Sequence, residues 1–260
     1  MREPMRRAAP VVAVLVFLLG WEGLVRAYEV PHYLLPAPSL VLATLWANFG
    51  SLMQSWWVTV SITFAALALA VLGGVLLASL FALSRWVEWS LTPFAVVLQV
   101  TPIIAIAPLI MILTDSALAT VLICAWIVAF FPILANTVTG LRSADANLRD
   151  LFQLYRASRW QLLRHLLIPS ALPYFLTGLK IAGGLSLIGA VVAEFTAGAA
   201  GRDTGLASRI LEAAFRTEIP KMFAALLLVS LTGVAIYLLF AGLARLVLGR
   251  WHDSEAGPRR

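Results

Sequence analysis

Charged residues are scarce in this sequence. Only 12% of its 260 residues are Asp, Glu, Lys or Arg, whereas 61% are hydrophobic, and the mean hydropathy is +0.92. A soluble globular domain carries about twice that share of charge, so the composition excludes one. The net charge of +6 does not indicate nucleic-acid binding, because membrane proteins collect Lys and Arg in the loops on one side of the bilayer. We therefore predict a membrane protein with no nucleic-acid partner.

Sequence motifs for catalysis and metal binding are also missing. Cys124 is the only cysteine, so no internal disulfide can form, and its apolar neighbours favour a buried structural thiol. There is no GxxxxGK(S/T) loop, no HExxH and no C-x-x-C pair, so the chain has no Walker-type ATP site and no recognisable metal motif. We expect neither an enzyme nor a cofactor on this chain. Energy for any transport then comes from a partner or from a gradient.

Long apolar runs predict an all-α membrane protein with six transmembrane helices. About 20 mostly apolar residues cross the hydrocarbon core as one helix. Asp115 alone separates two of the runs, which indicates a tight turn there. The predicted spans are Ala8 to Trp21, Trp57 to Leu83, Trp89 to Thr114, Ser116 to Leu141, Tyr174 to Gly198 and Met222 to Ala244.

The first span has two interpretations. "MREPMRR" followed by a short apolar core resembles a secretory signal peptide whose cleavage site would end at Ala27. Trp21 and Glu22 stand where a signal peptide has small or neutral residues, so we favour an uncleaved anchor that "GLVRAY" extends. We assign residues 1–56 to this helix and a periplasmic segment, 57–245 to a transmembrane domain and 246–260 to a cytoplasmic tail.

Lys and Arg are unevenly distributed between the predicted loops. If the N-terminus lies inside, the inner loops hold most of the arginines. The outer side then holds only Arg26, Arg202, Arg209, Arg216 and Lys221. Positive residues are retained on the cytoplasmic side, so both termini are predicted to be cytoplasmic. The largest cytoplasmic loop then runs from about Leu141 to Ser170.

This loop is predicted to contain two short helices. The first has an apolar face at positions i, i+3, i+4 and i+7, formed by Leu148, Leu151, Phe152 and Tyr155. Ser158 and Gln161 have the spacing of a capping box, which would start the second helix at Arg159. Pro169 and Pro173 are expected to end that helix and start the next span. The hairpin could dock on a partner protein or lie on anionic lipid.

The stretch "DLFQLYRASRWQLLRHLLIPSALP" resembles the EAA loop of inner-membrane subunits of binding-protein-dependent ABC importers. Asp150 stands at the acidic position of that motif, Arg156 at its glycine, and Pro169 closes it. If the turn needs a positive φ, Arg156 costs on the order of 1 kcal/mol relative to glycine. The ATPase-coupling residues that the resemblance and the helix pattern indicate are Leu148, Asp150, Leu151, Phe152, Tyr155, Arg156, Ala157, Ser158, Arg159 and Pro169.

The resemblance covers most of the chain. "LLPAPSLVLATL", "TPIIAIAPLIMI" and "AWIVAFFPILANT" are similar to the branch that imports nitrate, sulfonates, taurine and thiamine or pyrimidine precursors. It implies a type I ABC importer permease fold in the bacterial inner membrane, with both termini cytoplasmic. It also implies a cytoplasmic ATPase dimer that binds ATP and Mg, a periplasmic solute-binding protein, and a permease homodimer or pseudo-dimer in contact with membrane lipid. A gradient-driven secondary transporter is the alternative.

Polar residues within the predicted spans are candidates for a translocation path. They are Gln99, Thr101, Asn136 and Glu194. Uncharged ones could instead bond neighbouring helices, and Lys180 and Glu194 could each reach a membrane interface. These two charges are about 21 Å apart if they share one helix, too far to pair. The prolines expected to interrupt spans are Pro102, Pro108 and Pro132.

The sequence also predicts two amphipathic elements outside the spans and close helix contacts at glycines. An amphipathic helix is predicted after Gly205, either touching a binding protein or packing along the membrane, and a second such element is predicted over Ser39 to Phe49. The apolar face of the first is expected to hold Leu206, Ile210, Leu211 and Ala214. Close contacts between helices are expected at Gly73, Gly74, Gly183 and Gly184.

Overall fold

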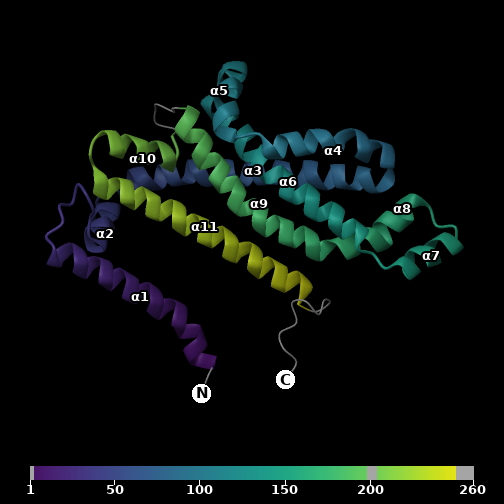
Figure 1. Ribbon diagram of the computed structural model, residues 1–260, viewed down its shortest axis with the longest axis horizontal. Helices are drawn as coiled ribbons and strands as arrows, with labels where there is room; N and C mark the ends of the chain where they lie inside the picture. Colours follow the sequence, from purple (N-terminus) through teal and green to yellow (C-terminus); the bar gives the residue numbers. More distant parts are fainter. Residues whose placement is uncertain (1–2, 198–203, 250–260) are drawn as a thin grey trace. The chain divides into compact units, whose positions relative to one another are not determined.

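The computed structural model describes residues 3–197 and 204–249, and these residues are helical with no strand (Figure 1). The all-α prediction is therefore confirmed. The helices are α1 (Glu3–Ala27), α2 (Pro38–Ala47), α3 (Phe49–Leu83), α4 (Arg85–Val100), α5 (Ile103–Thr114), α6 (Ala117–Arg142), α7 (Ala146–Leu154), α8 (Arg159–Leu162), the π-helical turn η1 (Leu163–Leu167), α9 (Ile168–Ala197), α10 (Leu206–Phe215) and α11 (Ile219–Leu248).

Two compact units can be distinguished. The first comprises Met1–Val58 with Ala200–Ser230, and the second comprises Thr59–Ala199 with Leu231–Arg260. Within the described ranges, five helices are long and apolar enough to cross a membrane: Ala9–Ala27, Phe49–Leu83, Ala117–Arg142, Arg159–Ala197 and Ile219–Leu248. A sixth span is counted if the bent pair α4 and α5 forms one span.

The predicted interruption of the third span at Pro102 is confirmed. α4 and α5 meet at an angle of 104°. Pro102 has no N–H to continue the helix and disfavours helical backbone at the preceding residue, and Thr101 is accordingly extended, with φ −72° and ψ 123°. The other two prolines do not interrupt their helices, since Pro108 lies inside α5 and Pro132 inside α6. The tight turn at Asp115 is confirmed, because this residue ends α5 with a φ of 49°.

The second loop helix does not end at Pro169, contrary to expectation. α8, η1 and α9 follow one another without a break, so the chain is helical from Arg159 to Ala197. η1 lies directly before Pro169, whose ring would clash with the carbonyl of His165 in a regular α-helix. A π turn is wider and accommodates the proline. The loop therefore continues into the longest described helix rather than being hinged to it.

In the second unit, α6 and α9 make the most extensive helix pair. Their backbones approach closely at small residues: a Cβ on Gly140 would lie 2.8 Å from Ala171 Cα, and one on Gly178 would lie 2.9 Å from the carbonyl oxygen of Pro132. Ser186 of α9 is fully buried and donates a 2.9 Å hydrogen bond to the carbonyl of Thr63 in α3. Small residues thus set the spacing of this unit.

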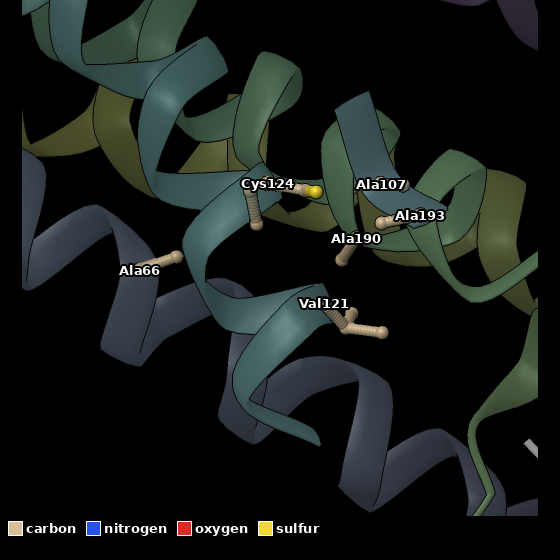
Figure 2. Packing of buried hydrophobic residues seen from close by; sticks show 7 residues of the cluster. Ala66, Ala107, Val121, Cys124, Ala190 and Ala193 are labelled. Carbon is tan, nitrogen blue, oxygen red and sulfur yellow. The ribbon is translucent and has the colours of Figure 1, made fainter. Parts of the chain in front are cut away.

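The core of this unit is made of small side chains. Figure 2 shows the alanine-rich cluster, in which Cys124 is fully buried among its neighbours. Helices can approach closely there because few large side chains separate them. The clustered residues are Ala66, Ala107, Val121, Cys124, Ala125, Ala190 and Ala193.

Three of the four predicted glycine contacts are confirmed. A Cβ would lie 3.3 Å from Phe130 at Gly73, 2.8 Å from Ile133 at Gly74 and 2.7 Å from Phe240 at Gly183. Gly184 is the exception, because a Cβ there meets nothing within 4 Å.

In the first unit, α2 and α10 pack against the beginnings of α3 and α11. The buried hydrophobic cluster between them consists of Val41, Leu52, Leu206, Ala224 and Ala225. Both predicted elements are therefore helices, and α10 is amphipathic as expected, whereas α2 is an apolar helix without a polar face.

The buried face of α10 differs from the prediction. Ala207 and Ala213 are buried, whereas Ala214 is exposed. On this helix the Arg209 guanidinium donates to Glu212 at 2.9 Å and holds the pKa of that carboxyl below its ordinary value, with help from Arg216. This small stabilising contribution is present at neutral pH and is lost as the pH falls through the lowered pKa.

The glycine spacing predicts different effects for two alanine variants. Gly140→Ala places a methyl group against the backbone of Ala171 and should destabilise the fold by about 1–3 kcal/mol. Gly184→Ala fills open space and should be neutral or stabilising by up to about 1 kcal/mol, because alanine favours helix. Thermal unfolding of the two purified variants in detergent measures the difference. Equal midpoints would show that α6 and α9 do not approach closely at Gly140.

Candidate functional site

The loop between α6 and α9, residues 143–167, begins with two capped helix ends. Ser143 Oγ donates to the carbonyl of Gly140 at 2.8 Å and closes the end of α6. Asp145 then caps α7, since its Oδ1 accepts from the backbone N–H groups of Asn147 at 2.7 Å and Leu148 at 3.3 Å. These bonds satisfy donors that a helix start leaves unpaired. The first predicted loop helix is confirmed.

α7 ends in a Schellman motif. The N–H of Arg156 donates to the carbonyl of Gln153 and the N–H of Ala157 donates to that of Phe152, each at 2.9 Å. This pattern places the residue after the C-cap in the left-handed region, which usually selects glycine. Arg156 occupies that position with a φ of 51°. The turn therefore does need a positive φ at the position where the EAA motif has glycine.

The capping box of the second loop helix is also confirmed. Ser158 Oγ accepts from the N–H of Gln161 at 3.2 Å, and Gln161 Oε1 accepts from the N–H of Ser158 at 2.8 Å. The helix begins at Arg159 as predicted. Two reciprocal bonds thus fix the turn between α7 and α8.

The predicted apolar face of α7 is not covered by the rest of the chain. Leu148, Leu151 and Tyr155 are exposed, Tyr155 by 78%, and Phe152 is half-buried. A concavity of about 450 Å³ opens between α7 and the helix that follows. We call it the loop concavity; its lining is Leu151, Phe152, Tyr155, Arg156, Ala157, Gln161 and His165. An apolar surface of this kind on a rigid hairpin is typical of an interaction site.

The structure brings together some of the predicted coupling residues and separates others. Leu151, Phe152, Tyr155, Arg156 and Ala157 share the loop concavity. Among the remaining predicted residues, Leu148, Asp150 and Ser158 lie exposed nearby in the sequence, Arg159 is directed to α3, and Pro169 is exposed in the first turn of α9.

Two arginines tie the loop to the spans. Arg149 Nη2 donates to the carbonyl of Leu141 near the end of α6 at 2.8 Å. Arg159 Nη1 donates to the carbonyl of Leu83, the last residue of α3, at 3.1 Å. Both meet the negative end of a helix, where the last carbonyls lack partners. Sequence reasoning assigned Arg159 to partner binding and missed both ties, because which helix ends lie nearby is not visible in the local pattern.

The predicted path residues lie at separate places. Gln99 and Thr101 flank the bend between α4 and α5, where Thr101 Oγ1 donates to the carbonyl of Val97. Asn136 donates to the carbonyl of Pro132 within α6. Glu194, 5% exposed, lies near the end of α9. No group of three or more His, Cys, Asp or Glu that could hold a metal occurs among the residues with described positions.

The comparison with known families identifies the chain. Residues 70–251 match the family "Binding-protein-dependent transport system inner membrane component". The chain belongs to this family. It is 34% identical to the riboflavin transport system permease protein of Chloroflexus aurantiacus, over 94% of this chain and 90% of that protein. It is 32% identical to the formylaminopyrimidine transport permease protein of Halalkalibacterium halodurans, over 98% of this chain and all of that protein.

Solved structures agree on the fold. The MetNI methionine ABC transporter in an inward-facing conformation matches with a TM-score of 0.67 at 16% identity, covering 77% of this chain and 98% of that one. The type I ABC permease fold is thus confirmed. The protein is a permease subunit of an ABC importer for a small solute, in the inner membrane, and the ATPase of such systems is a separate chain. This favours the importer over a gradient-driven transporter.

The backbone at Arg156 predicts a stabilising substitution. Glycine adopts a φ of 51° without the steric cost that a side chain carries, so Arg156→Gly should stabilise the end of α7 by about 1 kcal/mol. Arg156→Ala removes the same charge and keeps a Cβ, so it should give no such gain. Thermal unfolding of the two variants in detergent compares them. A gain in both would point to charge repulsion instead of backbone strain.

Proposed function

We propose that residues 143–167 are the site at which a cytoplasmic ATPase dimer, binding ATP and Mg, drives this permease. The observation that carries the proposal is the exposed apolar face of α7 on a hairpin that continues directly into α9. Leu148, Leu151, Phe152 and Tyr155 would fill a groove of the ATPase, and Asp150 would fix the register at its rim.

The anchoring of the hairpin supports this role. α7 is closed by caps at both ends, Arg149 and Arg159 hold the loop to α6 and α3, and η1 joins it to α9. A loop without these bonds would deform when the ATPase closes on its nucleotide. The observed loop instead transmits a displacement to the spans, which is what alternating access requires.

We propose the remaining assembly on the basis of charge and family. Both termini are cytoplasmic, which puts the arginine-rich loop on the ATPase side. A second copy of the chain completes the pathway, and a periplasmic solute-binding protein delivers the solute. The transmembrane domain covers residues 57–245, preceded by an uncleaved N-terminal anchor and followed by a cytoplasmic tail.

The coupling role predicts the effect of one truncation. Phe152→Ala removes an aromatic side chain from the lining of the loop concavity and should lower solute-stimulated ATP hydrolysis by about tenfold or more, because interface anchors of this kind contribute most of the affinity. Leu154→Ala is the matched control: Leu154 is 77% exposed on the same helix but does not line the loop concavity.

The measurement is ATP hydrolysis by the purified permease and ATPase complex in detergent, with binding protein and solute present. Reduced stimulation in Phe152→Ala and normal stimulation in Leu154→Ala support the assignment. Equal stimulation in both variants would contradict the docking role and favour a hairpin that lies on lipid.

For the solute, we propose a heteroaromatic compound of the pyrimidine-precursor type. Relatives named as permeases for riboflavin and formylaminopyrimidine are 34% and 32% identical to this chain, whereas relatives named for sulfonates and nitrate are 27% and 26% identical. The tentative path residues Gln99, Thr101, Asn136 and Glu194 include a carboxylate and no cation. That composition disfavours an anion such as nitrate or an alkanesulfonate.

The solute class is tested by uptake in cells that express the permease with its ATPase and binding protein. Uptake of labelled formylaminopyrimidine should be blocked by the unlabelled compound and unaffected by excess nitrate or alkanesulfonate. Glu194→Gln, which keeps the shape of the side chain, should reduce uptake at an unchanged amount of inserted protein. Competition by the anions would contradict the solute class, and full uptake by Glu194→Gln would remove this residue from the path.

A further inference from the structure

A second cavity lies in the same unit, where α3, α4 and α6 end or begin. We call it the basic cavity; its volume is about 480 Å³. Its lining combines three arginines and one acid with an apolar floor, and consists of Ala78, Phe81, Ala82, Arg85, Glu88, Trp89, Val138, Leu141, Arg142, Arg149 and Leu167. The translocation path does not use this site, and the coupling role shares only Arg149 with it.

The charges of the basic cavity do not cancel. Glu88 forms an ion pair with Arg142. That leaves Arg85 without an acidic partner among the described residues, and it leaves Arg149 bonded only to the carbonyl of Leu141. Arg149 Nε is buried and has no hydrogen-bond partner among the residues whose positions are described. A buried donor without an acceptor is costly, so the arrangement favours an anion that Arg85 and Arg149 can share.

The surroundings indicate the kind of anion. The cavity lies where spans end, because α3 stops at Leu83 and α6 stops at Arg142. Trp86 and Trp89 form an exposed edge-to-face pair beside it, with ring centroids 5.9 Å apart. Exposed tryptophans next to the ends of spans are typical of the headgroup level of a bilayer. An anion bound here is therefore placed at the depth of lipid phosphates.

The apolar floor accounts for the rest of the ligand. Trp89, which is 64% exposed, and the exposed Ala82 contribute apolar surface to the lining of the cavity. A neighbouring cavity of about 450 Å³ shares Arg85 and Leu167 and adds Arg159. A small inorganic ion would leave this apolar surface uncovered, whereas a molecule with a charged head and an acyl chain covers it.

We infer that the basic cavity binds the phosphate of an anionic phospholipid, with Arg85 and Arg149 as its ligands and the acyl chain against Trp89 and Ala82. Guanidinium groups bind phosphate oxygens through paired, charge-assisted hydrogen bonds. The orientation proposed above places this lipid in the cytoplasmic leaflet of the membrane. Only that detail rests on the proposed function. A bound lipid would hold α4 and the start of α7 at the same end of the spans.

The test is lipid retention by the full-length permease in detergent, measured by native mass spectrometry with dioleoyl phosphatidylglycerol and with dioleoyl phosphatidylcholine. Wild type should retain phosphatidylglycerol in preference to phosphatidylcholine. Arg85→Gln/Arg149→Gln should weaken retention of phosphatidylglycerol by about tenfold or more, as expected for the loss of two charge-assisted contacts. Arg85→Gln alone, at an exposed position, should give part of the loss without disturbing the loop.

The matched control is Arg164→Gln/Arg245→Gln, which removes the same charge from exposed arginines that do not line the basic cavity. Normal retention by this control supports a specific site. An equal loss in the control would overturn the inference, since it would show attraction by net charge alone. Displacement of the signal by millimolar inorganic phosphate, with no preference between the two lipids, would overturn it in favour of a soluble phosphate.

Discussion

The close approach of α6 and α9 is the constraint on which the second unit depends. Lipid tails are as apolar as leucine, so burial from water does not hold two spans together within a bilayer, and tight packing has to do so. Gly140 and Gly178 let the two backbones come within contact distance, and the alanine cluster around Cys124 continues that contact. The positions of α3 and α5 follow from this pair, since both pack against it.

Side-chain hydrogen bonds stabilise the fold in addition to helix packing, and in the loop they are concentrated at helix ends. Six side chains of the loop form hydrogen bonds with backbone groups that helix ends leave unpaired. They are those of Ser143, Asp145, Arg149, Ser158, Arg159 and Gln161. Arginine can do this at a distance because its side chain is long and its donors form a fixed fork. The loop therefore has a defined shape although little of it is buried.

The helices and their caps were largely predictable from the sequence because their causes are local. Apolar runs of sufficient length, the spacing of Ser158 and Gln161, and the family glycine replaced by Arg156 each depend on neighbouring residues. An interruption at Pro102 was predicted, but its angle of 104°, the unbroken helices at Pro108 and Pro132, and the π turn before Pro169 were not. Whether a proline breaks a span depends on whether nearby groups satisfy the freed carbonyl. Such groups come from distant parts of the chain, as do the partners of Arg149 and Arg159.

The uninterrupted helix from Arg159 to Ala197 has a mechanical consequence. It contains 39 residues and is about 58 Å long, with one end in the loop. It packs closely on α6 at three places along its length, because a Cβ on Gly140, Gly178 or Gly189 would lie within 3.0 Å of the facing helix. Two stiff rods joined along their length move together, so a displacement of the loop end is carried by α9 and α6 to the end of α9 that carries Glu194.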